Sequence, residues 1–180
     1  MKKFVIYLSC FFAIVFLCGC SMDNTPTKKT ERFLNNYKNL NSTVLTQLDD
    51  VVNGDTLMNS EQKDLYKEVL KKQYQDLTYT VKDEVINGNN AIVTVEIEVY
   101  DLYKTNKDTS DYYDTHKEEF IADVKVSDTK YLDYRIKQLQ NTRDKVKYTI
   151  DFNLTKVDKE WTMDEISNST IQKLHGLYAY

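Results

Sequence analysis

The residue best placed for chemistry is Asp83, a carboxylate on the apolar side of a segment in which apolar and polar residues alternate. Burial there would raise the pKa of the carboxyl group, so Asp83 could serve as a general base. Tyr79 and Tyr148 lie on alternating segments as well, and their hydroxyls could donate hydrogen bonds inside a cavity. In the alternative interpretation, Asp83 lies near a strand end, where its carboxylate interacts with water or a lysine. The two tyrosines are then ordinary core or boundary residues.

The sequence lacks the other residue patterns that commonly carry chemistry. His116 and His175 are the only histidines, and neither has a serine or cysteine motif beside it. His116 lies among acidic residues, which fits either a weak metal ligand or a solvated side chain. There is no glycine-rich phosphate loop, zinc-protease motif, nucleophile elbow or calcium-binding loop. We therefore predict no catalytic residue, no metal and no cofactor.

Aromatic side chains offer a different kind of site, because exposed rings stack on sugars and on protein partners. Trp161 with Tyr178 and Tyr180 could form such a surface, or Trp161 could anchor the last pair of strands in the core. The pair Tyr112-Tyr113 lies in an acidic stretch and is the better candidate for an exposed aromatic patch.

The first 20 residues resemble a bacterial lipoprotein signal peptide. Met1-Lys2-Lys3 is basic, residues 4–16 are almost all apolar, and Leu17-Cys18-Gly19-Cys20 ends the run. This run is shorter than the roughly 20 apolar residues of a membrane-spanning helix, although an uncleaved anchor is an alternative. The resemblance implies cleavage before Cys20 and a diacylglycerol on its sulfur. Two acyl chains anchor a protein stably, so the mature chain would stay on the extracytoplasmic face of the cell membrane.

Charge and cysteine content limit the partners and the means of stabilisation. Without Lys2 and Lys3, 22 basic residues face 28 acidic ones, a net charge of −6. This charge disfavours nucleic acid, since phosphate backbones bind to clustered positive charge. Of the three cysteines, only Cys20 stays in the mature chain. No disulfide framework is therefore expected, and the domain must depend on its own core.

Two periodicities predict the elements. Apolar residues at steps of three and four predict one helix over residues 31–52, ended by Gly54. Asn59 with Gln62 is typical of a capping box that opens a helix to Tyr74. The rest is expected in this order: an alternating hairpin over 77–86 and 91–99, a polar loop over 104–110, helices over 111–124 and 128–142, a hairpin from 146 to 163, and a short helix from 169.

These elements predict an α+β fold, with an antiparallel sheet of about four strands and helices packed on one face. The segment Val146 to Met163 has long alternating strands, a tight turn with aspartate, and Trp-x-Met. It resembles the last hairpin of nuclear transport factor 2-like, or cystatin-like, domains. That resemblance covers residues 29–180 and implies a cone-shaped sheet around a cavity. The expected organisation is a signal peptide at 1–19, a lipidated polar tether at 20–28 and a single extracytoplasmic domain at 29–180.

The sequence thus predicts a non-catalytic binding module for a protein partner or a small ligand at the cell surface. One alternative is a small-molecule enzyme of the isomerase type, in which Asp83 would act as the base and Tyr79 or Tyr148 as the oxyanion donor. A buried carboxylate facing a tyrosine hydroxyl in a closed cavity would favour the enzyme. Another alternative is a subunit of an envelope complex, which an exposed apolar patch or an unpaired strand edge would favour.

Overall fold

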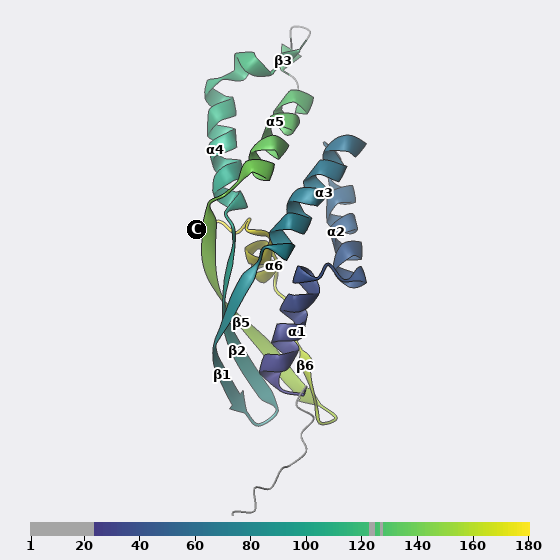
Figure 1. Cartoon of the computed structure of the whole chain (residues 1–180), viewed down its shortest axis with the longest axis vertical. Coiled ribbons are helices and arrows are strands. Elements are labelled where there is room, and N and C mark those ends of the chain that lie inside the picture. The colour runs from purple at the N-terminus through teal and green to yellow at the C-terminus, as the bar shows by residue number, and fades with distance from the viewer. Residues whose placement is uncertain (1–23, 123–124, 127) are drawn as a thin grey trace, which may run out of the picture.

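A computed structural model of the chain describes residues 24–122, 125–126 and 128–180. Cys20, the expected signal peptide and the first part of the expected tether lie outside these residues. The elements follow in this order (Figure 1): α1 Pro26–Lys38, α2 Ser42–Gly54, α3 Ser60–Gln75, β1 Thr78–Asn87, β2 Asn90–Tyr100, α4 Leu102–Thr115, the 3₁₀ helix η1 Lys117–Phe120, β3 Ile121–Ala122, β4 Lys125–Val126, α5 Asp128–Asn141, β5 Lys145–Val157, β6 Glu160–Met163 and α6 Asn168–His175.

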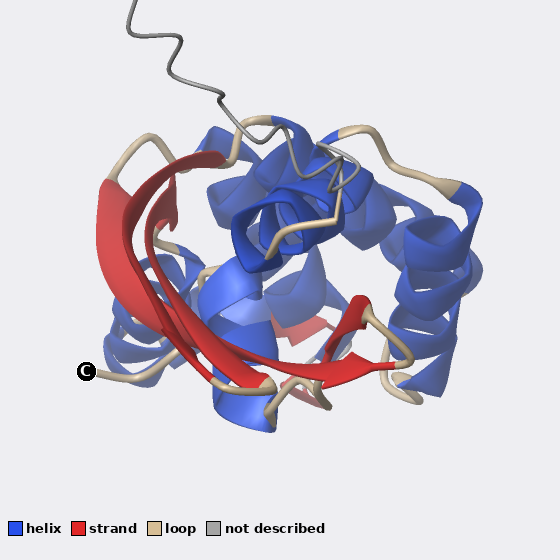
Figure 2. Cartoon of the chain, turned by 90° about the horizontal axis from the view of Figure 1, so that it is seen from below, coloured by secondary structure: helices blue, strands red, loops and turns tan. Residues whose placement is uncertain are grey.

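Four strands form an antiparallel sheet in the order β1-β2-β5-β6. The sheet is curved, and helices fill its concave side (Figure 2). The α+β class, the strand number and the placement of helices against the sheet are therefore confirmed.

The core lies between the concave face and the helices. Alternate residues of the two central strands point into it, so Val95, Ile97 and Phe152 are at most 1% exposed. Leu34, Leu70 and Leu174 from three helices close the core from the other side. Trp161 is buried too, which places it in the core and not on an aromatic surface.

The first helical segment differs from the expected single helix over residues 31–52. The helical backbone is interrupted after α1, where Leu40 has a φ of 49°. The side chain of Asn41 then accepts a hydrogen bond from the Val44 amide at 2.9 Å and opens α2. The apolar pattern runs through this break because both helices pack on the same core. At the other end, Thr25 caps α1 and Pro26 is its first residue, so residues 26–28 of the expected tether are helical.

The segment around residues 104–110 is a helix and not the expected polar loop. Asp101 caps α4 by accepting from the Lys104 amide at 2.9 Å. Ion pairs between residues four apart, such as Lys104–Asp108 at 2.7 Å, then line its exposed side. The helix ends at Thr115, so the helix expected over 111–124 is wrong as well. The polar sequence suggested a loop because α4 projects beyond the sheet and buries few side chains, so the helix has little apolar pattern.

The molecule is elongated, with two different ends (Figure 1). The α4–α5 pair, joined through η1, β3 and β4, forms the upper end. The β1–β2 turn, the β5–β6 turn and the start of α1 lie together at the lower end.

Gly176 should be the least replaceable glycine that the structure describes. It ends α6 with a φ of 68°, and an added Cβ would collide with the Tyr100 carbonyl and the Gln73 amide. We expect Gly176→Ala to lower the free energy of unfolding by about 2 kcal/mol or more, measured by urea titration. Gly54→Ala is the control, because a Cβ there meets no atom within 4 Å. Equal stabilities of the two variants would contradict this account.

Candidate functional site

The structure places Asp83 on the outer face of the sheet and not in a cavity. Val81 lies opposite Val95, but the next aligned pair is Asp83 opposite Thr94, because a bulge intervenes. One extra residue moves the following side chains to the opposite face. Asp83 is therefore exposed, and its carboxylate accepts from the Glu84 amide at 2.9 Å.

Tyr79 and Tyr148 share the inner face, but their hydroxyls have separate partners. They lie on either side of Ile97, which pairs with both in the sheet. Tyr79 donates to the Asn35 side chain at 3.2 Å, and Tyr148 donates to the Tyr178 carbonyl at 3.1 Å. Burial raises the pKa of Tyr148 to about 12, so it stays a donor to that carbonyl. The geometry does not bring these tyrosines to Asp83.

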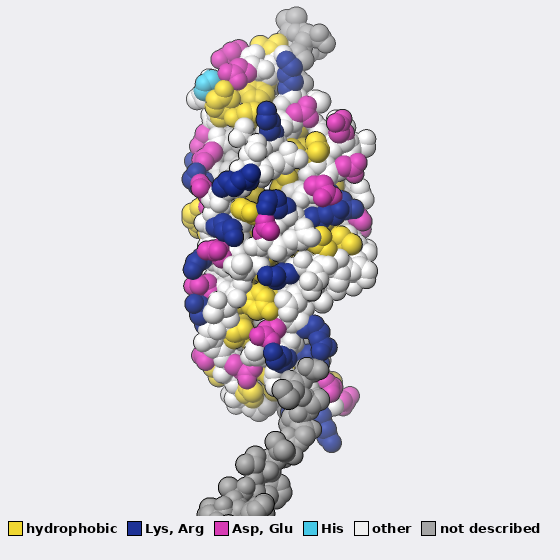
Figure 3. All heavy atoms as spheres, viewed as in Figure 1, with side chains coloured by type: hydrophobic (Ala, Val, Ile, Leu, Met, Phe, Trp, Pro, Cys, Tyr) yellow, Lys and Arg dark blue, Asp and Glu magenta, His cyan; other side chains and the backbone are white. Residues whose placement is uncertain are grey.

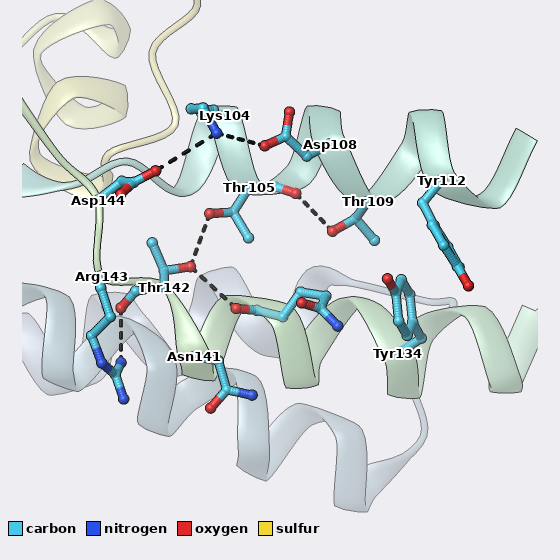
Figure 4. A pocket seen from close by; sticks show the side chains of 11 residues that line it. Lys104, Thr105, Asp108, Thr109, Tyr112, Tyr134, Asn141, Thr142, Arg143 and Asp144 are labelled. Atoms are coloured by element: carbon cyan, nitrogen blue, oxygen red, sulfur yellow. Dashed lines mark hydrogen bonds and ion pairs between the residues drawn. The ribbon is translucent and has the colours of Figure 1, made fainter.

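A cleft of about 430 Å³ lies instead between α4 and α5 (Figure 4). Its size is within the usual range for small-molecule sites. Side chains from both helices and from the segment after α5 line it: Lys104, Thr105, Asp108, Thr109, Tyr112, Tyr134, Gln138, Asn141, Thr142, Arg143 and Asp144.

Threonine hydroxyls connect the two walls of the cleft. Thr105 and Thr142 lie 2.9 Å apart across it, and Thr109 donates to the Thr105 carbonyl at 2.7 Å. Thr105 also reaches the Asp101 carbonyl at 3.1 Å, and Thr142 reaches the Gln138 carbonyl at 3.2 Å. A hydroxyl has one proton and two lone pairs. Since these protons point to protein oxygens, the hydroxyls offer acceptor capacity to a ligand.

The rim of the cleft carries balanced charges. Lys104 contacts Asp108 at 2.7 Å and Asp144 at 3.6 Å. The hydrogen bond with Asp108 raises the pKa of Lys104, which keeps the ammonium group charged. Arg143 donates to the Thr142 carbonyl at 2.9 Å. Two cations and two carboxylates therefore line the cleft, which has no strong preference for ligands of either sign.

Aromatic rings form one end of the cleft. Tyr112 and Tyr134 stack at 5.3 Å between ring centroids, and His116 stacks on Tyr112 at 4.0 Å. Tyr112 donates to the Glu119 carboxylate at 2.8 Å, which fixes the tilt of the ring. Tyr113 and Tyr131 pack around Phe120 beside them. The expected aromatic patch at Tyr112-Tyr113 thus belongs to a half-buried cluster, near the hydrophobic side chains at the upper end in Figure 3.

Sequence reasoning missed the polar lining of this cleft. Thr105 and Thr109 are four residues apart, so they share one face of a helix. This spacing did not indicate a shared helix face, because residues 104–110 were expected to form a loop. Gln138 and Asn141 lie within the correctly expected helix over 128–142, but polar residues on one helix face usually indicate solvent. These residues form a site only because α4 and α5 face each other.

A second, mostly apolar pocket of about 330 Å³ lies between α1, α2, α3 and α6. Phe33, Tyr37 and Tyr74 form an aromatic wall there, with successive centroids about 5 Å apart. The Tyr74 hydroxyl lies 2.8 Å from Nε2 of His175. Burial lowers the pKa of His175 to about 4 and raises that of Tyr74. The hydrogen bond therefore joins a protonated tyrosine hydroxyl to a neutral imidazole.

Neither a cluster of metal ligands nor a membrane-spanning helix occurs among the residues that the structure describes. No three or more histidine, cysteine, aspartate or glutamate side chains gather there in a way that could hold a metal ion. None of the helices in the same ranges has the length and apolar character needed to cross a bilayer.

Comparison with known proteins gives one distant likeness. No protein-family model matches the chain, and no curated protein matches it. Among solved structures, the chain is similar to a crystal structure of YcdA, a candidate lipoprotein of Bacillus subtilis, with 14% sequence identity and a TM-score of 0.43. The match covers 83% of this chain but 47% of YcdA, so the chain spans about half of that protein's length. The likeness to nuclear transport factor 2-like domains stays a prediction.

His175 should make the fold sensitive to acid. Its pKa is about 4 in the folded protein and 6.5 when solvated, so the unfolded chain binds a proton that the folded chain does not. This contribution to stability is complete above pH 6.5 and is lost as the pH falls to 4. We expect a loss of up to about 3 kcal/mol in the free energy of unfolding over that interval.

Urea titrations at several pH values measure this loss. His175→Gln should reduce the dependence of the free energy of unfolding on pH. His116→Gln should retain this dependence because His175 is unchanged. If both variants follow the wild type, His175 is not the responsible group.

Proposed function

We propose that the protein is an extracytoplasmic lipoprotein, anchored through Cys20, whose α4–α5 cleft binds a neutral, hydroxyl-rich ligand without chemical conversion. The observation that carries the proposal is the cleft itself. It combines hydroxyls, amides, balanced charges and an aromatic wall at the end of the molecule opposite the start of α1 (Figures 1 and 4).

The composition of the cleft favours a neutral carbohydrate over other ligand classes. A phosphate or a nucleotide needs an excess of positive charge, and here Lys104 and Arg143 are offset by Asp108 and Asp144. A sugar hydroxyl both donates and accepts hydrogen bonds. The carboxylates and threonine oxygens supply acceptors, and the cationic and amide groups supply donors. The apolar face of a sugar ring can pack on Tyr134.

The position of the cleft fits a protein that is tethered at its N-terminus. Asn24 holds the incoming chain against the β5–β6 turn, because its side-chain amide donates to the Lys159 carbonyl at 2.9 Å and accepts from the Trp161 amide at 3.0 Å. A lipid on Cys20 would keep this lower end near the bilayer. The sheet then separates the cleft from the membrane, which leaves it open to ligands from outside the cell.

The two alternatives differ in their support. A cavity enzyme built on Asp83, Tyr79 and Tyr148 loses its basis, since the carboxylate lies on the other face of the sheet.

A subunit of an envelope complex is the second candidate function, because β1 pairs with β2 alone and leaves the other edge of a ten-residue strand unpaired in the described sheet. Chemical cross-linking in cells, compared between the native chain and Thr80→Pro, would test it: loss of a cross-linked partner is the expected sign of edge pairing.

Lipid anchoring is tested by Cys20→Ala. The variant cannot accept a thioether-linked lipid, so we expect it to leave the membrane fraction and to lack the mass of the diacylglycerol. Cell fractionation and intact-mass spectrometry measure both properties. A variant that stays in the membrane at unchanged mass would contradict the lipoprotein proposal.

Ligand binding is tested by Tyr134→Ala with the full-length protein in a phosphocholine detergent, which carries no sugar headgroup. Maltotriose, cellotriose and chitotriose are titrated by calorimetry. Loss of the stacking wall should weaken binding by about tenfold. Tyr131→Ala is the matched control, because Tyr131 lies one turn away on α5 and does not line the cleft. No binding of any sugar, or equal losses in both variants, would overturn the carbohydrate assignment.

A further inference from the structure

We propose that the lower end of the sheet docks directly on the surface of a lipid bilayer, with the β1–β2 and β5–β6 turns in contact with the lipid. This inference rests on the proposed lipid anchor at Cys20. It goes beyond anchoring because it assigns an orientation and a lipid-contacting surface to the folded domain.

The length of chain between the anchor and the fold restricts where the domain can be. Asn24 is fixed to the β5–β6 turn by its two hydrogen bonds with Lys159 and Trp161. Four residue steps separate Cys20 from Asn24, which span at most about 14 Å when fully extended. A diacylglycerol on Cys20 would therefore keep this turn close to the bilayer surface.

Large apolar side chains are exposed at the same end. Val85 is 54% exposed, Ile92 43% and Val157 55%. Val85 and Ile92 are directly paired on the outer face of the hairpin. The Lys156 amide donates to the Asn89 carbonyl at 2.7 Å, so the end of β5 lies beside the β1–β2 turn. Ile86, 51% exposed, points to the other face, so the tip of the hairpin is apolar on both sides.

A lipid surface is the occupant that fits this patch. Exposed apolar side chains that gather at one place mark an interaction surface, and at a membrane interface they bury themselves among acyl chains. Charges around the patch are mixed: Lys29 pairs with Glu160 at 3.2 Å, and Glu84 accepts from Thr27. Docking should therefore depend on apolar contact more than on anionic lipid, and added salt should change it little.

Single nitroxide labels test the orientation. The mature chain has no cysteine other than Cys20, whose sulfur carries the lipid, so Val85→Cys and Val157→Cys each give one labelling site. The lipidated full chain is reconstituted in phosphatidylcholine vesicles. We expect both labels to gain accessibility to oxygen and to lose accessibility to a water-soluble nickel chelate. Leu57→Cys is the control, an exposed apolar position between α2 and α3 at the upper end, which should stay in water.

A second variant separates docking from anchoring. Ile92→Asp places a charge in the patch and should return the label at position 157 to water, while the protein stays with the vesicles. Leu57→Asp should leave the label at 157 unchanged. If the labels at 85 and 157 are in water while the protein stays on the vesicles, docking is overturned and the anchor stands. Release of the unsubstituted protein from the vesicles would overturn both proposals.

Discussion

The antiparallel pairing of β2 with β5 is the constraint on which the rest of the molecule depends. It runs along the whole of β2, from Asn90 opposite Thr155 to Tyr100 opposite Lys145. Alternate side chains of both strands are buried beneath the helices, so a shift of one residue would place the apolar side chains in water. Just beyond the sheet, the Asp101 amide donates to the Asp144 carbonyl at 2.9 Å, which joins the start of α4 to the segment after α5. The end of the cleft that Lys104 and Asp144 line is thus an extension of the central strand pair.

Helix α3 is held against the same strand pair by one side chain that forms hydrogen bonds with both backbone groups of a strand residue. Gln73 is fully buried, and its amide donates to the Tyr100 carbonyl and accepts from the Tyr100 N–H, each at 3.0 Å. One side chain thereby satisfies both backbone groups of a residue at the end of β2. Gly176 passes close to the same carbonyl, so α6 reaches its place only because that residue has no side chain. Both α3 and α6 therefore depend on Tyr100, at the end of β2.

The sequence predicted the parts of this fold that depend on periodicity and on local capping. The alternation of β2 and β5, the capping box of Asn59 with Gln62 and the apolar face of α5 are all confirmed. It failed where a single residue changes the geometry without changing the pattern. Leu40 splits one apolar stripe into two helices, and the extra residue after Val81 reverses the sides of β1. The cleft could not be predicted, because it exists only where α4 and α5 face each other, and the helical spacing of Thr105 and Thr109 falls in a segment that was expected to be a loop.

The bulge in β1 decides which side chains lie on each face of the hairpin near its tip. It turns Glu84 toward the helices, where the carboxylate accepts from the Thr27 amide at 2.8 Å and the Thr27 hydroxyl at 2.6 Å at the start of α1. The same extra residue turns Val85 outward, next to Ile92. If the same residues paired with β2 without the bulge, the two sides would be exchanged, so the helix would lose its carboxylate while the outer face gained one in place of a valine. The first turn of α1 and the apolar tip therefore depend on the same irregularity, so a change that made this strand regular without removing a residue would disturb both.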